Sequence, residues 1–296
     1  MPAKARGHYY FPARGPRIAA LRVRSNGERR ASHPHDLTEV EHDHDFMELV
    51  LVLRGCARQR LEGEDYPVQA GDVYILHSRS RHYFHQIKDL ELINVLFDPK
   101  QVPIPQGELR QLPGYCALFL LEPQYRRRHR FSSRLHLGPE ALVHVRRIGE
   151  EMVAETARAE PGSAVMLLAG LLELITFLSR QYDKATTVQG RELLRVARVI
   201  QSLEQEFQRG WRVSELARMA GMSRSTFIRT FEHAVGHPPI DYLIRRRVAA
   251  AMELLRGTDR PVTDIALETG FSDSNYFSRQ FRRVTGMTPS RYRGRS

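Results

Sequence analysis

Two stretches in the last third of the 296-residue chain repeat one pattern of residues. The first stretch carries, in order, Ala217, Gly221, Ser223, Phe227, Phe231, Gly236, Pro239 and Tyr242. The second carries Ala266, Gly270, Ser272, Phe277, Phe281, Gly286, Pro289 and Tyr292. The offset is 49 for the first three pairs and 50 for the last five. Because self-similarity at a fixed spacing indicates copies of one supersecondary unit, this region is predicted to fold as two equivalent units.

Each copy has the residue order of a helix, a tight turn and a second helix. In the first copy, Val213–Ala220 places its apolar residues on one side of a short helix. Gly221 permits a left-handed turn at little cost, and Ser223 is a favourable cap for a second helix that runs to about Val235. The two phenylalanines of the repeat lie four residues apart, and therefore on one buried face of that helix.

The second copy follows the same order. Helices are predicted over 262–269 and 276–285, with a turn at Gly270 and a cap at either Ser272 or Asp273. A helix, a tight glycine turn and a capped second helix together make a helix-turn-helix motif. One such match is weak evidence, whereas two in register are strong evidence.

A further helix is predicted between the copies, over 240–256, about 25 Å long at 1.5 Å per residue. Because successive major-groove faces of DNA recur about every 34 Å, a rigid connector of this size suits two recognition helices in adjacent grooves. The region from Lys184 to Ser296 holds 20 Lys and Arg against 11 Asp and Glu, a net of +9 out of the chain's +11. This charge favours a polyanionic partner. The alternative is a helical bundle with solvated arginines.

The second copy also closely resembles the DNA-binding domain of the AraC/XylS transcription regulators. The match is carried by Ala266, by the string Gly270–Arg283 and by Gly286–Arg293, and it covers about the last hundred residues. The resemblance implies two helix-turn-helix units joined by one long helix, in a regulator, most simply an activator, that binds double-stranded DNA. It also implies a contact with RNA polymerase near Asp273.

The predicted buried faces leave a defined set of side chains for DNA. Arginine suits guanine and asparagine suits adenine, whereas hydroxyl groups near a helix start suit phosphates. The predicted contact residues are Ser223, Arg224, Ser225, Thr226 and Arg229 in the first unit and Ser274, Asn275, Ser278 and Arg279 in the second.

The N-terminal half is predicted to be β-structure. Apolar runs at 46–53, 71–76 and 90–97 have the length and turn signals of strands. His42, His44 and Glu48 share one face at the strand period of two, and His82 follows later. This arrangement resembles the cupin barrel over about 80 residues, although His77, Arg79 and Gln86 depart from its second motif. The fold class is therefore predicted as α+β, a cupin-like barrel followed by an all-α domain.

Two functions remain open for the barrel. His42, His44, Glu48 and His82 have the chemistry to hold a divalent Fe, Mn, Ni or Zn ion, which would suit a metal-dependent cupin enzyme fused to a DNA-binding domain. Alternatively, the stretch His44–Val50 resembles the rhamnose regulators of the AraC family, which bind an effector. In that case a small polar effector such as a sugar is expected to contact His42, His44, Glu48, Arg58, Arg60 and His82.

Two amphipathic helices are predicted over 139–160 and 163–182. The resemblance implies that they form a homodimer, while packing on their own barrel is the alternative. The predicted domains are thus an effector-binding barrel (1–137), a helical dimerisation segment (138–183), a polar linker (184–190) and the DNA-binding domain (191–296).

Three further features suggest a cytoplasmic regulator with no catalytic activity. Two cysteines, Cys56 and Cys116, are too few for a disulfide framework. The apolar run around 165–178 is broken by Gly170 and Glu173, and the first residues lack the apolar core of a secretory signal. Motifs for a nucleophilic triad, a phosphate loop or a dinucleotide site are absent from the sequence.

Overall fold

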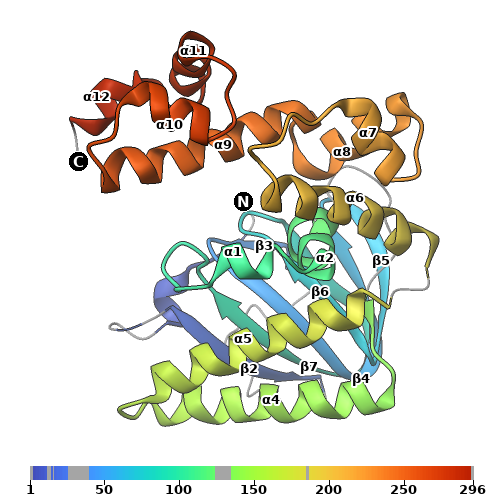
Figure 1. Cartoon of the computed structure of the whole chain (residues 1–296). Helices are drawn as coiled ribbons and strands as arrows, with labels where there is room; N and C mark the ends of the chain where they lie inside the picture. The colour runs from blue at the N-terminus through green and yellow to red at the C-terminus, as the bar shows by residue number, and fades with distance from the viewer. Residues whose placement is uncertain are drawn as a thin grey trace. The chain divides into compact units, whose positions relative to one another are not determined.

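The computed structural model describes residues 3–11, 15, 17–25, 40–123, 135–184 and 187–294. The chain divides into two compact units, Met1–Arg191 and Glu192–Ser296, each of which is described by itself (Figure 1). The first unit is built on a β-sheet and the second on helices, which confirms the predicted α+β class.

Within the described residues, the first unit contains one eight-stranded sheet. Its strands are β1 (Ala3–Ala5), β2 (Ile18–Arg24), β3 (His42–His44), β4 (Met47–Leu61), β5 (Glu64–Gln69), β6 (Asp72–Leu76), β7 (His82–Phe97) and β8 (Leu135–His136). The long strands β4 and β7 pair antiparallel at its centre. Strands β2 and β3 add to β7, β5 and β6 add to β4, and β1 pairs with β3 in parallel. The three predicted strands are confirmed as parts of β4, β6 and β7.

The inner face of the sheet is an apolar core, and β4 changes face along its length. Val50 and Val52 lie in this core, and so do Ala57 and Leu61. An unbroken strand would alternate sides every residue, so residues of even and odd number would not share a face. The pairing of β4 with β7 shifts register three times between Val52 and Arg58, and these β-bulges rotate the strand.

Helices complete the first unit. They are η1 (Gly7–Tyr9), α1 (Gln106–Leu109), α2 (Pro113–Tyr115), the π-helix η2 (Cys116–Leu121), α4 (Pro139–Arg158) and α5 (Ser163–Tyr182). Helices α4 and α5 lie side by side and pack on β2 (Figure 1). By length and composition α5 is apolar enough to cross a membrane, in spite of Gly170 and Glu173. Its residues Leu167, Leu171 and Ile175 are buried, as in a core helix.

The second unit consists of helices. They are α6 (Val188–Gln205), α7 (Val213–Met219), α8 (Arg224–Val235), α9 (Pro239–Gly257), α10 (Val262–Glu268), α11 (Ser274–Thr285) and α12 (Pro289–Arg293). Helix α6 begins at Val188, so residues 188–190 of the predicted linker (184–190) are helical. Residues 185 and 186 lie outside the described part.

The two helix-turn-helix units have the predicted local structure. Ser223 accepts a hydrogen bond from the Thr226 amide at the start of α8, and Asp273 accepts one from the Tyr276 amide at the start of α11. The cap of the second unit is therefore Asp273, and α11 begins two residues before the predicted start. Gly221 and Gly270 have φ of 62° and 89°, the left-handed region that glycine enters freely.

Candidate functional site

Four polar side chains gather at one end of the sheet interior. Strand β3 supplies His42 and His44, β4 supplies Glu48 and β7 supplies His82, which pairs directly with His42 in the sheet. All four are buried, with exposed fractions between 1% and 7%. The short turn from β3 into β4 sets Glu48 beside His44, so the predicted residues are brought together.

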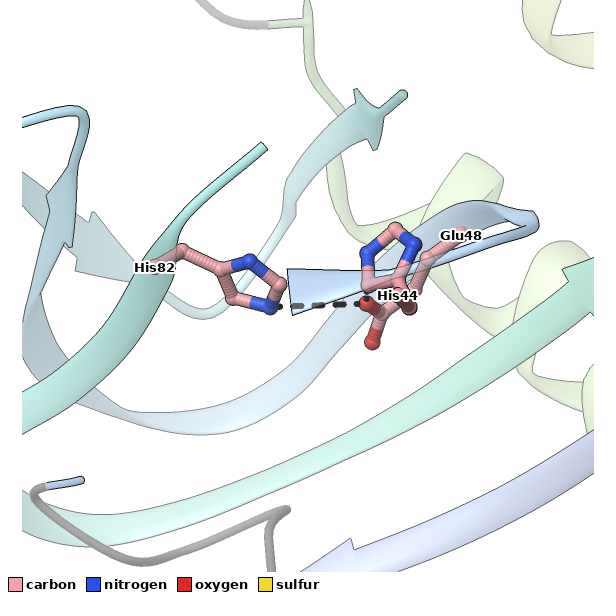
Figure 2. A group of neighbouring side chains, drawn as sticks. All are labelled: His44, Glu48 and His82. Atoms are coloured by element: carbon pink, nitrogen blue, oxygen red, sulfur yellow. Dashed lines mark ion pairs between the residues drawn. The ribbon is translucent and has the colours of Figure 1, made fainter. Parts of the chain in front are cut away.

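Three of these residues form a tight set, which we call the histidine–glutamate cluster: His44, Glu48 and His82 (Figure 2). One nitrogen or oxygen of each lies within 4.8 Å of the others. His44 Nε2 is 3.2 Å and His82 Nε2 is 3.6 Å from the same oxygen, Glu48 Oε2. The His42 ring lies outside this set, with its centroid 4.4 Å from that of His82. These are the residues that have the chemistry to hold a divalent metal.

The surroundings of the cluster decide its charges. Burial lowers the pKa of His82 to about 3, so this ring is neutral at pH 7. Burial also acts to raise the pKa of Glu48, but the close contact with the neighbouring His44, its largest opposing interaction, helps to outweigh it. The pKa of Glu48 therefore lies below its usual range, and the carboxylate is ionised.

Further polar side chains that sequence reasoning missed face the same interior. Asn94 of β7 pairs with Val50 of β4, and Val50 pairs with Tyr74 of β6, so both polar groups share the inner face with Val50. Asn94 is 3% exposed and its Oδ1 has no hydrogen-bond partner in the described structure. Gln59 is also buried. The sequence did not single out Asn94 because its neighbours in 90–97 are apolar. The one available signal was its even spacing from His82, which puts both residues on one face of a regular strand.

Two residues predicted to contact an effector, Arg58 and Arg60, are not brought together with the histidine–glutamate cluster. The side chains of Arg58 and Arg60 are 42% and 41% exposed, while their neighbours Ala57 and Gln59 are buried. Arg60 instead donates two hydrogen bonds to Asp65, of 2.9 and 3.0 Å. The β-bulges between Val52 and Arg58 turn both arginines to the outer face.

The predicted DNA-contact residues of the first helix-turn-helix unit lie at or near the surface of α8. Arg224, Ser225 and Arg229 are exposed, and Thr226 is half-buried. Ser223 is exposed, but its hydroxyl is engaged with the Thr226 amide at 3.2 Å and the Thr226 hydroxyl at 2.8 Å. A structural cap role therefore accounts for Ser223 without DNA.

In α11 the exposed predicted residues are Asn275 and Arg279, while Ser274 and Ser278 are half-buried. The guanidinium of Arg279 lies 5.8 Å from the centre of the Tyr276 ring. Arg282 is exposed and follows Asn275 and Arg279 at helical spacing, so it belongs to the same outer face. Sequence reasoning missed Arg282, although its spacing of seven residues from Asn275 was visible.

Two family models match the chain. A model of the AraC-like ligand binding domain matches residues 28–172, and a model of a helix-turn-helix domain matches residues 216–295. The HTH-type transcriptional activator RhaR of Shigella flexneri and that of Escherichia coli strain K12 are each 28% identical to the chain over 263 residues, 88% of this chain and 89% of theirs. The solved DNA-binding domain of AdpA in complex with a target DNA is 34% identical over 34% of this chain and 91% of that one, with a TM-score of 0.33.

Proposed function

Because the chain belongs to the AraC family of DNA-binding transcription regulators, we propose that it is an activator whose α8 and α11 read operator DNA when an effector occupies its sheet domain. The proposal rests on the duplicated helix-turn-helix unit, in which each second helix has an exposed polar face. Side chains on these faces donate to base edges and phosphates, and the excess of arginine supplies affinity.

Base reading is assigned to Arg224, Ser225 and Arg229 in α8 and to Asn275 and Arg279 in α11, because these side chains are exposed. Thr226, Ser274 and Ser278 are half-buried, and their hydroxyl groups are assigned to phosphates. Helix α9 has 19 residues and is therefore about 28 Å long, a suitable spacer for adjacent major grooves.

The effector is proposed to be a small polar molecule such as a sugar, bound at the inner face of the sheet. His42, His44, Glu48 and His82 would contact it, and Asn94 adds a buried amide whose oxygen accepts from hydroxyl groups. A buried polar atom without a partner is costly, so a hydroxyl-rich ligand would satisfy His44 Nε2 and Asn94 Oδ1. The relatives are named as activators, which supports a sensing role without catalysis.

A cytoplasmic homodimer that contacts RNA polymerase completes the proposal. Val143 of α4 and Val165 and Met166 of α5 are 66%, 68% and 57% exposed, and a partner copy would cover such apolar side chains. Sedimentation at micromolar concentration should give a species of twice 34.2 kDa. A sole species at the monomer mass would contradict the dimer.

The central experiment is selection of genomic DNA from the source organism by the full-length protein. Enriched fragments should share a motif of two half-sites about 10 base pairs apart. The matched control is Arg54→Ala, which removes an exposed arginine of the sheet domain and should leave the enrichment unchanged. Absence of any shared motif would contradict the proposed operator binding.

A second experiment tests the effector. The candidate sugars are the substrates of the proteins that genes near the selected DNA encode. The effector among them should raise the unfolding temperature of the protein and change its affinity for the selected DNA. Asn94→Ala should weaken both effects. Chemical turnover of a bound sugar would contradict the sensor and favour the enzyme alternative.

A further inference from the structure

Helix α9 joins the two helix-turn-helix units but does not by itself fix how they are oriented. It fixes their separation, because its 19 residues form a stiff rod about 28 Å long. Each unit could still turn about its end of this rod unless other contacts hold it. Contacts of that kind occur at two places in the described part of the chain.

The first place is around Arg247, a charged side chain of α9 that is only 9% exposed. Its guanidinium donates hydrogen bonds to Phe207 O and to Arg209 O, each at 2.7 Å. Both carbonyls lie in the loop from α6 to α7, which leads into the first helix-turn-helix unit. The guanidinium also lies 5.7 Å from the centre of the Phe271 ring, in the turn of the second unit. Arg247 therefore contacts both units.

The backbones of the two units meet beside Arg247. A Cβ at Gly270 would lie 2.6 Å from Gln208 Cα, so the second turn already touches the loop without a side chain. Trp211 holds the loop in shape, because its indole donates to Glu206 O at 2.9 Å. We call the arrangement of the loop 206–211, Arg247, Gly270 and Phe271 the Arg247 seam.

The second place is the start of α9. Asp241 accepts hydrogen bonds from Arg245 of the same helix at 2.8 Å and from Arg283 of α11. Its neighbour Tyr242 packs edge-on against Phe231 of α8, with 5.8 Å between the ring centres. The first turn of α9 is therefore attached to a helix of each unit. Because the Arg283 side chain is half exposed, we expect this contact to contribute less than the buried Arg247.

We propose that Arg247 is a positioning residue for DNA binding, which locks the two helix-turn-helix units in one orientation and so restricts the protein to operators with one separation between half-sites. The inference rests on the proposed function, in which α8 and α11 read the two half-sites. A locked pair of units loses no further orientational freedom when the second half-site binds, so correctly separated half-sites are bound tightly. One added base pair moves the second half-site by about 3.4 Å and rotates it by about 34°, which a locked pair cannot follow.

The test compares three duplexes, in which the half-sites of the selected operator are at the selected separation, one base pair closer or one base pair farther apart. A short duplex with a single pair of half-sites admits one DNA-binding domain of the full-length protein. The wild type should bind the shifted duplexes at least about 10-fold more weakly than the selected one. In Arg247→Met this ratio should fall to about 3-fold or less, because its units can reorient. A fourth duplex with only one half-site should bind both proteins equally.

Two further variants of α9 separate orientation from charge. Arg247→Lys keeps the charge but has no planar group that bonds two carbonyls at once, so its ratio should lie between those of the wild type and Arg247→Met. The matched control is Arg256→Met, which removes an exposed arginine that donates to Met252 O within α9, and its ratio should equal that of the wild type. The fluorescence of Trp211 shows whether each variant is folded. If Arg247→Met does not fold, Arg247→Lys provides the comparison.

An unchanged ratio in a folded Arg247 variant would overturn the proposal. An equal loss of affinity on all four duplexes would also overturn it, because a residue that only stabilises the domain or contacts phosphate has no influence on separation. A wild type that binds one half-site but has no preferred separation would overturn the inference and leave the proposed function intact. Failure of the wild type to bind any of the duplexes would contradict the proposed function and the inference with it.

Discussion

The two helix-turn-helix units share a core and differ in their surroundings. In the first, the rings of Phe227 and Phe231 lie 5.5 Å apart at 62°, and in the second those of Phe277 and Phe281 lie 5.5 Å apart at 63°. A tyrosine of the following helix packs edge-on against the second ring in each unit. The repeated apolar residues therefore give both units the same core packing, whereas the exposed faces of their second helices and their turns differ.

The outer faces of α8 and α11 carry different charges at equivalent positions. Ser225, Arg229 and Glu232 of α8 correspond, 50 residues later, to Asn275, Arg279 and Arg282 of α11. The second face therefore has two positive charges, while those of the first face cancel. Because cations on this face attract phosphate and arginine reads guanine, we infer that α11 contributes more of the DNA affinity.

The turns of the two units also differ. A side chain at Gly221 would meet only the end of Arg195 at 4.0 Å, whereas one at Gly270 would lie 2.6 Å from the backbone of Gln208, in the loop between α6 and α7. The buried guanidinium of Arg247 on α9 donates to Phe207 O at 2.7 Å in this loop. The second turn is thus packed on the first half of the domain.

The largest predicted contrast follows from this packing. Gly270→Ala should destabilise the domain by about 3–4 kcal/mol, from a left-handed alanine and a backbone clash together, and Gly221→Ala by about 1–2 kcal/mol from the left-handed alanine alone. Urea unfolding followed by the fluorescence of Trp211, the single tryptophan of the chain, reports this domain. An equal loss of unfolding free energy in the two variants would contradict the proposed difference in packing between the two turns.

A second prediction sharpens the role of the loop. Arg247→Met should cost about 2–3 kcal/mol, because Arg247 also donates to Arg209 O at 2.7 Å and its loss leaves two partly buried carbonyls without this donor. The matched variant Arg246→Met removes a partly exposed ion pair with Glu204 and should cost about 1 kcal/mol or less. The same Trp211 unfolding curve measures both. A larger loss for Arg246→Met would contradict the packing argument.

The third prediction concerns DNA. Arg229→Ala and Asn275→Ala should each weaken binding to the selected operator by about 10-fold or more, which corresponds to loss of one base contact. Binding to random duplex should change less, and titration of fluorescent duplexes at one fixed salt concentration measures both. Equal loss on both duplexes would show that these residues contact phosphate and not bases.

The sequence predicted local features well and long-range ones poorly. The repeat located both helix pairs because capping, turn and apolar spacing act within a few residues, and the close spacing of His44 and Glu48 likewise fixed their neighbourhood. Alternation along β4 does not show that Arg58 and Arg60 lie apart from the histidine–glutamate cluster, since β-bulges reverse the face of the strand. The contact of Gly270 with Gln208 joins segments far apart in the chain, so no local pattern contains it.

The smallest predicted contrast is between the two helix caps. Asp273 accepts the Tyr276 amide at 2.6 Å, whereas Ser223 accepts the Thr226 amide at 3.2 Å and is shared with the Thr226 hydroxyl. A carboxylate also interacts favourably with the positive end of the helix dipole. Asp273→Ala should therefore cost about 1 kcal/mol and Ser223→Ala about 0.5 kcal/mol, measured by urea unfolding. Because ions screen the interaction with the helix dipole, the difference between the two losses of stability should shrink in 1 M salt. A difference that salt does not change would contradict the dipole contribution and leave hydrogen-bond geometry as its cause.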